Sequence, residues 1–253
     1  MKYTTTFAQL YSQGRPEYPI EVIRDILNGF PMGCQVADLG AGTGIGAYQL
    51  AAVGAKVWAV EPQLAMQDNG KTHPHITWVL GQAEEVPLAE QSVDIVTAFQ
   101  AFHWFDFRRS LCECCRVLKP QGRLALVWNF WHQKDPVSRA YTQFVYQLFL
   151  EATGQQPIFK HYRTVWEHVD YWLFWNQIRI PHFRGLQRHT YTFKQALSFA
   201  QLVALTMSQE FIFSTHLEKS FVAEKLQSLF PDHRKDDEII LTYVTYLYLA
   251  RRP

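Results

Sequence analysis

The stretch Val36-Ala37-Asp38-Leu39-Gly40-Ala41-Gly42-Thr43-Gly44-Ile45-Gly46 governs how the rest of the chain is interpreted. An apolar run carries an acid near its end, glycines then alternate with other residues, and a helical pattern follows. This order predicts a buried strand, a tight turn and a helix start. Alternating glycines let a ligand approach the backbone, and free N–H groups at a helix start favour polar or anionic ligand groups. The stretch therefore predicts a nucleotide-type cofactor at the carboxyl end of the first strand of an open α/β sheet.

Two cofactor patterns fit this loop. The run from Gly42 to Ala47 satisfies the dinucleotide pattern G-x-G-x-x-G/A. The spacing Gly40-x-Gly42-x-Gly44, with Asp38 two residues earlier, resembles motif I of the class I S-adenosylmethionine (SAM)-dependent methyltransferases. A carboxylate there would face the ammonium of SAM near its sulfonium, whereas it would repel the pyrophosphate of NAD. The resemblance thus implies that Asp38 and the backbone of Gly40, Ala41, Gly42 and Gly44 bind SAM.

Bulk properties narrow the class of protein. The 253 residues and 48% hydrophobic content allow one large domain, expected over 1–253. A net charge of +1 without a long basic run argues against nucleic acid as an obligatory partner. No apolar run is long enough for a membrane span, and no apolar segment follows the first residues, so we expect a cytoplasmic protein. We expect it to be a monomer or a homodimer. Three of the four cysteines cluster at 112–115, but no second ligand pair supports a metal site.

A second acid follows the next predicted strand, Lys56–Val60. Glu61 lies about twenty residues past the glycines, where an acid can accept hydrogen bonds from two ribose hydroxyls of a bound cofactor. Pro62 follows it directly and would lie beside the same ligand. NAD enzymes share this spacing, so Glu61 supports adenosine binding without choosing between SAM and NAD.

The loop after the predicted strand Ile76–Leu80 reads Gly-Gln-Ala-Glu-Glu from Gly81. The resemblance implies that this loop holds the adenine, with a backbone N–H at Ala83, the Gln82 side chain and neighbouring Glu84 as contacts. The family often has Asp where Gln82 stands. Glutamine can both donate and accept hydrogen bonds, so it can bind the same edge of the adenine ring.

An N-terminal arm, residues 1–19, carries Phe7, Tyr11 and the run Arg15-Pro16-Glu17-Tyr18-Pro19. Two prolines around a tyrosine predict an extended turn. The pattern resembles a methyltransferase subgroup that includes the trans-aconitate methyltransferases, in which this arm lies over the cofactor cleft. That resemblance implies that Tyr11 and Arg15 line the acceptor site. The alternative is that Tyr18 and Pro19 simply dock the arm on the domain.

A run of polar and aromatic residues, from Gln100 to Trp104, follows the predicted strand Val93–Phe99. It resembles the Q-A-x-H-W segment of the same subgroup and would lie where the methyl group is delivered. Gln100 and His103 are the catalytic candidates, since His103 could orient the acceptor or take a proton from it. Gln100 could also contact the cofactor, and Trp104 could exclude water. A histidine satisfied by local backbone is the alternative.

The second part of the chain predicts a cap and the remaining strands. Asn129 ends the predicted strand Arg123–Asn129 over the cleft and is a substrate-binding candidate. Residues 131–183 are rich in aromatics, with one helical face, and predict a helical cap that either packs plainly or covers a small acceptor. The remaining strands and helices are predicted over Leu186–Phe193, Lys194–Met207, Leu217–Phe230 and Ile239–Ala250.

Together these patterns predict an α/β fold with a Rossmann-like, seven-stranded, mostly parallel sheet, helices on both faces, an antiparallel last strand and a cap after strand five. The implied activity is SAM-dependent methyl transfer to a small-molecule acceptor, a carboxylate or a hydroxyl, which yields S-adenosylhomocysteine (SAH). Two alternatives stay open. One is a non-catalytic module that binds SAM or SAH and acts through a protein partner. The less favoured one is an NAD-dependent oxidoreductase, for which no Tyr-x-x-x-Lys pair is evident.

Overall fold

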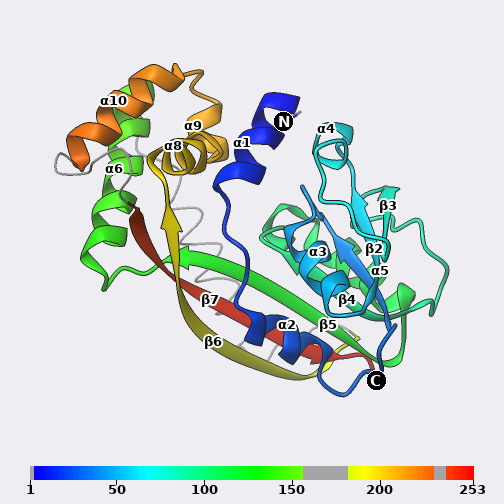
Figure 1. Cartoon of the computed structure of the whole chain (residues 1–253). Coiled ribbons are helices and arrows are strands. Elements are labelled where there is room, and N and C mark those ends of the chain that lie inside the picture. The colour runs from blue at the N-terminus through cyan, green and yellow to red at the C-terminus, as the bar shows by residue number, and fades with distance from the viewer. Residues whose placement is uncertain (1–2, 156–181, 231–237) are drawn as a thin grey trace.

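A twisted seven-stranded sheet forms the centre of the protein in the computed structural model, which describes residues 3–155, 182–230 and 238–253 (Figure 1). The strand order is β3-β2-β1-β4-β5-β7-β6. Strand β7 pairs antiparallel with both β5 and β6, and the other pairs are parallel. The predicted sheet class, strand number and antiparallel last strand are therefore confirmed. The strands are β1 (Gln35–Leu39), β2 (Lys56–Glu61), β3 (Ile76–Leu80), β4 (Val93–Phe99), β5 (Leu118–Trp131), β6 (Arg184–Leu197) and β7 (Ile239–Arg251).

Helices cover both faces of the parallel part of the sheet. On one face, α2 (Ile20–Leu27) and α3 (Ile45–Ala52) bury their apolar side chains against β1, β2 and β4. On the other face lies α5 (Phe107–Val117), which contributes Cys114 to the core as a small hydrophobe. No cluster of three or more potential metal ligands occurs among the described residues. Burial on both faces explains why β1 and β4 are nearly continuous apolar runs.

A separate group of helices gathers at the end of the sheet formed by β5, β7 and β6 (Figure 1). These helices are α1 (Thr5–Gly14), α6 (Pro136–Thr153), α8 (Phe199–Met207), α9 (Glu210–Phe213) and α10 (Lys219–Leu229). Their apolar side chains form one core cluster with the ends of β6 and β7. The predicted apolar face of the cap, from Tyr141 to Leu148, lies on α6 and packs into this cluster. The rest of the predicted cap, 156–181, falls outside the described residues.

Several element boundaries differ from the sequence-based expectation. Strand β5 begins at Leu118, because the predicted turn at 119–122 forms an irregularity inside the strand, where the register with β4 shifts. The helix predicted from Lys194 begins only at Phe199, because β6 continues to Leu197 in pairing with β7. Ser198 caps that helix with Gln201 in a reciprocal capping box. The arm contains a helix, α1, that the sequence did not predict, before the extended turn that it did.

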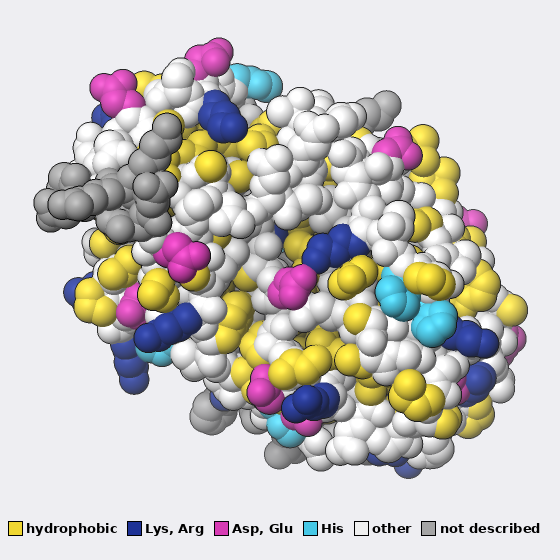
Figure 2. All heavy atoms as spheres, in the orientation of Figure 1, with side chains coloured by type: hydrophobic (Ala, Val, Ile, Leu, Met, Phe, Trp, Pro, Cys, Tyr) yellow, Lys and Arg dark blue, Asp and Glu magenta, His cyan; other side chains and the backbone are white. Residues whose placement is uncertain are grey.

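Charges on the surface are interspersed by sign. On the face shown in Figure 2, Lys and Arg side chains alternate with Asp and Glu, and no large area of one sign develops. This distribution agrees with the net charge of +1. Within the described ranges, no helix is both long and apolar enough to cross a bilayer.

Candidate cofactor and acceptor site

The glycine-rich loop between β1 and α3 has the backbone that its sequence demands. Gly40, Gly42 and Gly44 have φ values of +65°, +58° and +74°, in the left-handed region that glycine adopts most readily. The N–H groups of Gly40 and Ala41 both donate to the carbonyl of Val60 in β2, at 2.9 and 3.1 Å. The loop is therefore held against the end of β2 before any ligand binds.

Close packing at Gly40 adds a second reason for glycine. A Cβ on Gly40 would lie 2.7 Å from the Cβ of Ala101 and 3.1 Å from the ring of Phe105. The predicted segment 100–104 thus packs directly onto the glycine loop. The structure brings these two sequence signals, more than fifty residues apart in the chain, into one site at the carboxyl ends of β1 and β4.

Asp38, the last residue but one of β1, has a buried carboxylate that is only partly hydrogen-bonded. Its Oδ1 accepts a hydrogen bond from Thr97 Oγ1 at 2.8 Å, while Oδ2 is buried without a hydrogen-bond partner. The pKa of Asp38 is raised to about 7 by burial and by the charge of Glu61, while hydrogen bonding from Thr97 and from the backbone N–H of Ala47 opposes the shift. A buried acceptor atom that lacks a donor calls for a ligand or an equivalent group.

Glu61, at the end of β2, holds the glycine loop from the other side. Its two oxygens accept from the N–H groups of Gly42 and Gln63, at 2.9 and 3.0 Å. Burial raises the pKa of Glu61, and these two backbone bonds counteract the shift. Each carboxylate oxygen can accept more than one hydrogen bond, so the side chain still has capacity for ligand hydroxyls. Pro62, next in the chain, is exposed at the same edge.

The two buried carboxylates have no counter-charge among the residues that the structure describes. Asp38 and Glu61 are 1% and 5% exposed, and neither forms an ion pair with a basic side chain of the described residues. Two like charges in a buried site raise each other's pKa and favour a cationic ligand. A cradle of left-handed glycines with an orphaned carboxylate oxygen fits the ammonium and sulfonium of SAM.

The three predicted adenine contacts in the loop after β3, Gln82, Ala83 and Glu84, lie in different surroundings. Gln82 and Glu85 form an isolated antiparallel bridge, which makes a tight turn. Ala83 is buried. The Oε1 of Glu84 accepts from the N–H of Asp106 at 2.6 Å and ties the loop to the start of α5.

Gln100 and Asn129 lie next to each other at the carboxyl ends of β4 and β5. Gln100 has a left-handed backbone, with φ of +52°, and its side-chain amide donates to the carbonyl of Asn129 at 2.8 Å. The side-chain oxygen of Asn129 accepts from Thr245 Oγ1 in β7, at 2.6 Å. Both side chains are therefore partly occupied in holding the strand ends together.

His103 lies in a short 3-10 turn (Phe102–Trp104) and contacts a residue that the sequence analysis missed. The indole N–H of Trp128, in β5, lies 3.2 Å from Nδ1 of His103. Because an indole nitrogen can only donate, Nδ1 is the acceptor and the neutral ring carries its proton on Nε2. Burial lowers the pKa of His103 from 6.5 to about 4. The neighbouring Trp104 ring lies 5.0 Å from that of His103, and Trp104 is 53% exposed.

The arm brings Tyr11 and Arg15 together beside α8. The Arg15 guanidinium lies 4.8 Å from the centre of the Tyr11 ring. Its Nε and Nη2 donate to the Oγ and carbonyl oxygen of Ser208, at 3.1 and 2.7 Å. No carboxylate of the described residues forms an ion pair with it. A half-buried cation without an acidic partner is suited to an anionic group on a ligand.

Tyr18 connects the arm to the glycine-loop side of the site. Its backbone N–H and carbonyl pair with the side-chain amide of Gln49 in α3, at 2.9 and 2.8 Å, so Tyr18 does dock the arm. Its ring packs on Phe99 at 4.7 Å. Burial raises the pKa of Tyr18, as do Tyr11 and Asp38, while Arg15 lowers it. The side chain therefore lies within the electrostatic reach of both Asp38 and Arg15.

Two residues near the site, Trp128 and Thr43, were not singled out from the sequence. Trp128 looks like an ordinary core aromatic, and only its hydrogen bond to His103 gives it a place in the site. Thr43, inside the glycine loop, has a buried hydroxyl without a hydrogen-bond partner. A polar residue between two glycines of a ligand loop is a signal that could have marked Thr43.

The strand order, the antiparallel strand β7 between β5 and β6, and the acid-flanked glycine loop define a class I methyltransferase fold. Residues 37–126 match the family model described as a methyltransferase domain. This match and this fold support a class I SAM-dependent methyltransferase, with the family similarity carried by residues 37–126.

Two curated relatives show how the similarity is distributed. An uncharacterized methyltransferase of Mycobacterium tuberculosis is 46% identical over 120 residues, which is 47% of this chain and 49% of the relative. The match thus spans about half the length of that relative. A methyltransferase-like protein of Schizosaccharomyces pombe is 29% identical over 251 residues, 96% of this chain and 92% of the relative.

Solved structures share the fold at low identity. A structure from Anaeromyxobacter dehalogenans, provisionally assigned as a type II methyltransferase, has a TM-score of 0.68 and 20% identity, and covers 94% of this chain and 97% of its own. Phosphoethanolamine N-methyltransferase 2 of Haemonchus contortus, solved with phosphomonomethylethanolamine and SAH, has a TM-score of 0.57 and 14% identity. That match covers 99% of this chain and 58% of the nematode chain.

Proposed function

We propose that the protein transfers the methyl group of SAM to a small-molecule acceptor. The observation that carries this proposal is the buried pair of carboxylates, Asp38 and Glu61, around a left-handed glycine loop without a counter-cation in the described residues. Asp38 and the loop backbone would hold the methionine end of the cofactor. Glu61 would accept from the ribose hydroxyls, and Gln82 and Ala83 would contact the adenine.

The nature of the reaction limits what the protein must do. SAM supplies a methyl group already activated by its sulfonium, so transfer is an in-line displacement. The side chains at the site therefore have to align the acceptor and exclude water more than they have to activate a bond. The exposed Trp104, beside His103, is the candidate for excluding water.

For His103 we propose a role as hydrogen-bond donor to the acceptor instead of general base. The Trp128 indole uses the lone pair on Nδ1, so Nε2 carries the proton of the neutral ring and acts as a donor, not as an acceptor. A ring whose pKa is about 4 is neutral at pH 7 and a weak base. A donor at this place favours an acceptor that is nucleophilic without losing a proton to the protein, such as a carboxylate.

Arg15 supports the same choice of acceptor. Its guanidinium is held by Ser208 and Tyr11, without an acidic partner in the described residues. A cation fixed in this way can bind one oxygen pair of an acidic small molecule. We therefore propose an acceptor that carries a carboxylate, placed between Arg15 and His103.

The proposal is tested by titration calorimetry with SAM, SAH and NAD. We expect SAM and SAH to bind and NAD not to bind. Glu61→Ala should weaken SAH binding by about tenfold or more, because it removes the acceptor for two backbone N–H groups and for the ribose. Binding of NAD alone would overturn the proposal.

A screen of acceptors with radiolabelled SAM separates an enzyme from a binding module. Small mono- and dicarboxylates are the first set, and the corresponding amides, which lack the negative charge, are the matched control. Label should pass to an acid and not to its amide. Tight SAM binding with no transfer to any acceptor would instead favour a non-catalytic module that acts through a protein partner.

A further inference from the structure

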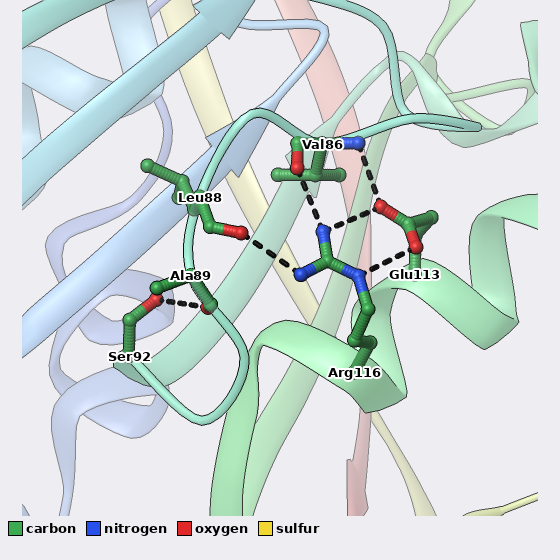
Figure 3. Close-up of polar contacts among 6 residues, drawn as sticks. All are labelled: Val86, Leu88, Ala89, Ser92, Glu113 and Arg116. Atoms are coloured by element: carbon green, nitrogen blue, oxygen red, sulfur yellow. Dashed lines mark hydrogen bonds and ion pairs between the residues drawn. The ribbon is translucent and has the colours of Figure 1, made fainter.

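The loop between β3 and β4 is held in place by an ion pair on α5. Arg116 donates to the carbonyl of Leu88 through Nη1, at 2.9 Å, and to the carbonyl of Val86 through Nη2, at 2.7 Å. The same guanidinium binds both carboxylate oxygens of Glu113, each at 2.7 Å. Figure 3 shows these contacts converging on one guanidinium.

Glu113 also binds the backbone of the loop directly. Its Oε2 also accepts from the backbone N–H of Val86, at 2.8 Å. The pair therefore binds both the N–H and the carbonyl of Val86, which fixes the orientation of that part of the backbone (Figure 3). Arg116 lowers the pKa of Glu113, and Glu113 in turn raises the pKa of Arg116, so both groups stay charged at neutral pH.

The start of α5 holds the other end of the same loop. The N–H of Asp106, the N-cap residue of α5, donates to Glu84 Oε1 at 2.6 Å. One helix thus binds the loop at Glu84 and again at Val86 and Leu88. Gln82 and Ala83, the proposed adenine contacts, lie directly before these points, and Gln82 is joined to the loop by its bridge to Glu85.

We propose that Glu113 and Arg116 are positioning residues for the adenine end of the cofactor. They hold the loop from Gln82 to Leu88 in its ligand-binding shape before SAM arrives. The inference rests on the proposed function, because it assigns a purpose to a loop that we propose contacts adenine. Preorganisation of this kind raises affinity by removing the cost of ordering the loop on binding.

The geometry also predicts which substitution at Arg116 preserves the function. A guanidinium reaches two carbonyls and a carboxylate at once, through donors in a fixed plane, whereas the ammonium of lysine cannot span all three. Arg116→Lys keeps the charge and the ion pair with Glu113, but it should lose the loop contacts. The variant therefore separates the role of charge from the role of loop positioning.

The test measures SAH binding by calorimetry for the wild type, Arg116→Lys, Arg116→Gln and Glu113→Gln, well below each variant's melting temperature. We expect affinity to fall by about tenfold for both Arg116 variants and by a smaller factor for Glu113→Gln. Lys225→Gln is the matched control. The side chain of Lys225 is exposed to a similar extent as that of Arg116; the change breaks an ion pair with Glu151, outside the loop, and should leave SAH affinity unchanged.

A second readout distinguishes positioning from general stability. S-inosylhomocysteine differs from SAH only at the base, so the ratio of the two affinities reports how well the loop distinguishes the ring edge. That ratio should fall towards one in the Arg116 variants. Lower melting temperatures with unchanged affinity and unchanged ratio would overturn the inference. Failure of the wild type to bind SAH would instead refute the proposed function itself.

Discussion

The proposed cofactor side and the proposed acceptor side of the site are built in different ways. The cofactor side comprises β1, β2, β4 and the loops at their carboxyl ends, and its contacts join neighbouring strands of one sheet, such as those of Asp38 and Thr97, which are 59 residues apart. Gly42 and Glu61 are 19 residues apart. The acceptor side comprises α1, α6, α8 and the adjoining ends of β6 and β7, where Arg15 and Ser208 are 193 residues apart.

This difference explains where sequence similarity is strongest. The family match covers residues 37–126, which include the glycine loop, both acids and the segment from Gln100 to Trp104. A site made by adjacent strands of one sheet depends on residues at fixed positions along those strands and their loops. A site made by distant helices can be rebuilt with other residues, which allows different acceptors on one fold.

The largest expected effects on stability come from replacing two glycines, one on the cofactor side and one on the acceptor side. Gly40→Ala should lower the free energy of unfolding by about 3 kcal/mol or more, since it combines a left-handed φ with overlap on Ala101. It should also abolish measurable SAH binding. Urea unfolding and calorimetry measure the two effects.

Gly14→Ala is the matched change on the acceptor side. Its Cβ would lie 2.3 Å from the backbone nitrogen of Leu205 in α8, so it should also destabilise the protein. We expect SAH affinity to stay within about twofold, because the glycine loop is held by β2 independently of the arm. A comparable loss of SAH affinity in both variants would show that the two sides are one unit.

Arg15→Gln tests whether the acceptor side can be changed without changing SAH affinity. The change removes the charged group that donates hydrogen bonds to Ser208, so it should lower the free energy of unfolding by about 1–3 kcal/mol. Methyl transfer to a carboxylate acceptor should fall by about tenfold or more while SAH affinity is retained. Arg15→Lys keeps the charge and should recover part of the activity. Equal loss of SAH binding and transfer would place Arg15 on the cofactor side.

A smaller effect is expected from the titration of Asp38. Because its pKa is raised to about 7, the folded state binds a proton that the unfolded state has lost, so stability from this group falls as pH rises from about 4 to 7. A cationic ligand favours the ionised form, so SAM binding at pH 7 should release about half a proton. Calorimetry in buffers of different ionisation enthalpy measures that release, and Asp38→Asn should eliminate it. Binding without proton release in the wild type would contradict a cation beside Asp38.

The smallest expected effect is the pH dependence that His103 contributes. Its pKa is lowered from 6.5 to about 4, so the unfolded state gains a proton first and stability from this group is lost as pH falls between those values. His103→Gln should flatten this part of the stability profile. Trp128→Phe should free Nδ1 and shift the tautomer, which nitrogen chemical shifts of the ring report. An unchanged tautomer in Trp128→Phe would show that the indole does not set it.

The sequence by itself determined the cofactor side. An acid at the end of a buried strand, three alternating glycines and a second acid after the next strand are local features, and parallel pairing necessarily brings their carboxyl ends together. It proposed Tyr11 and Arg15 together only through a family resemblance, and it did not predict the helix α1 that carries Tyr11.

Only the tertiary structure decided what those residues contact. Four features depend on contacts between separate elements of the chain. They are the bond of Arg15 to Ser208, the Trp128 bond that fixes the His103 tautomer, the bond of Glu84 to the start of α5 and the extension of β6 to Leu197. Periodicity and spacing describe one segment at a time. Which hydrogen bond a buried polar group finally makes is decided by the neighbours that packing brings to it.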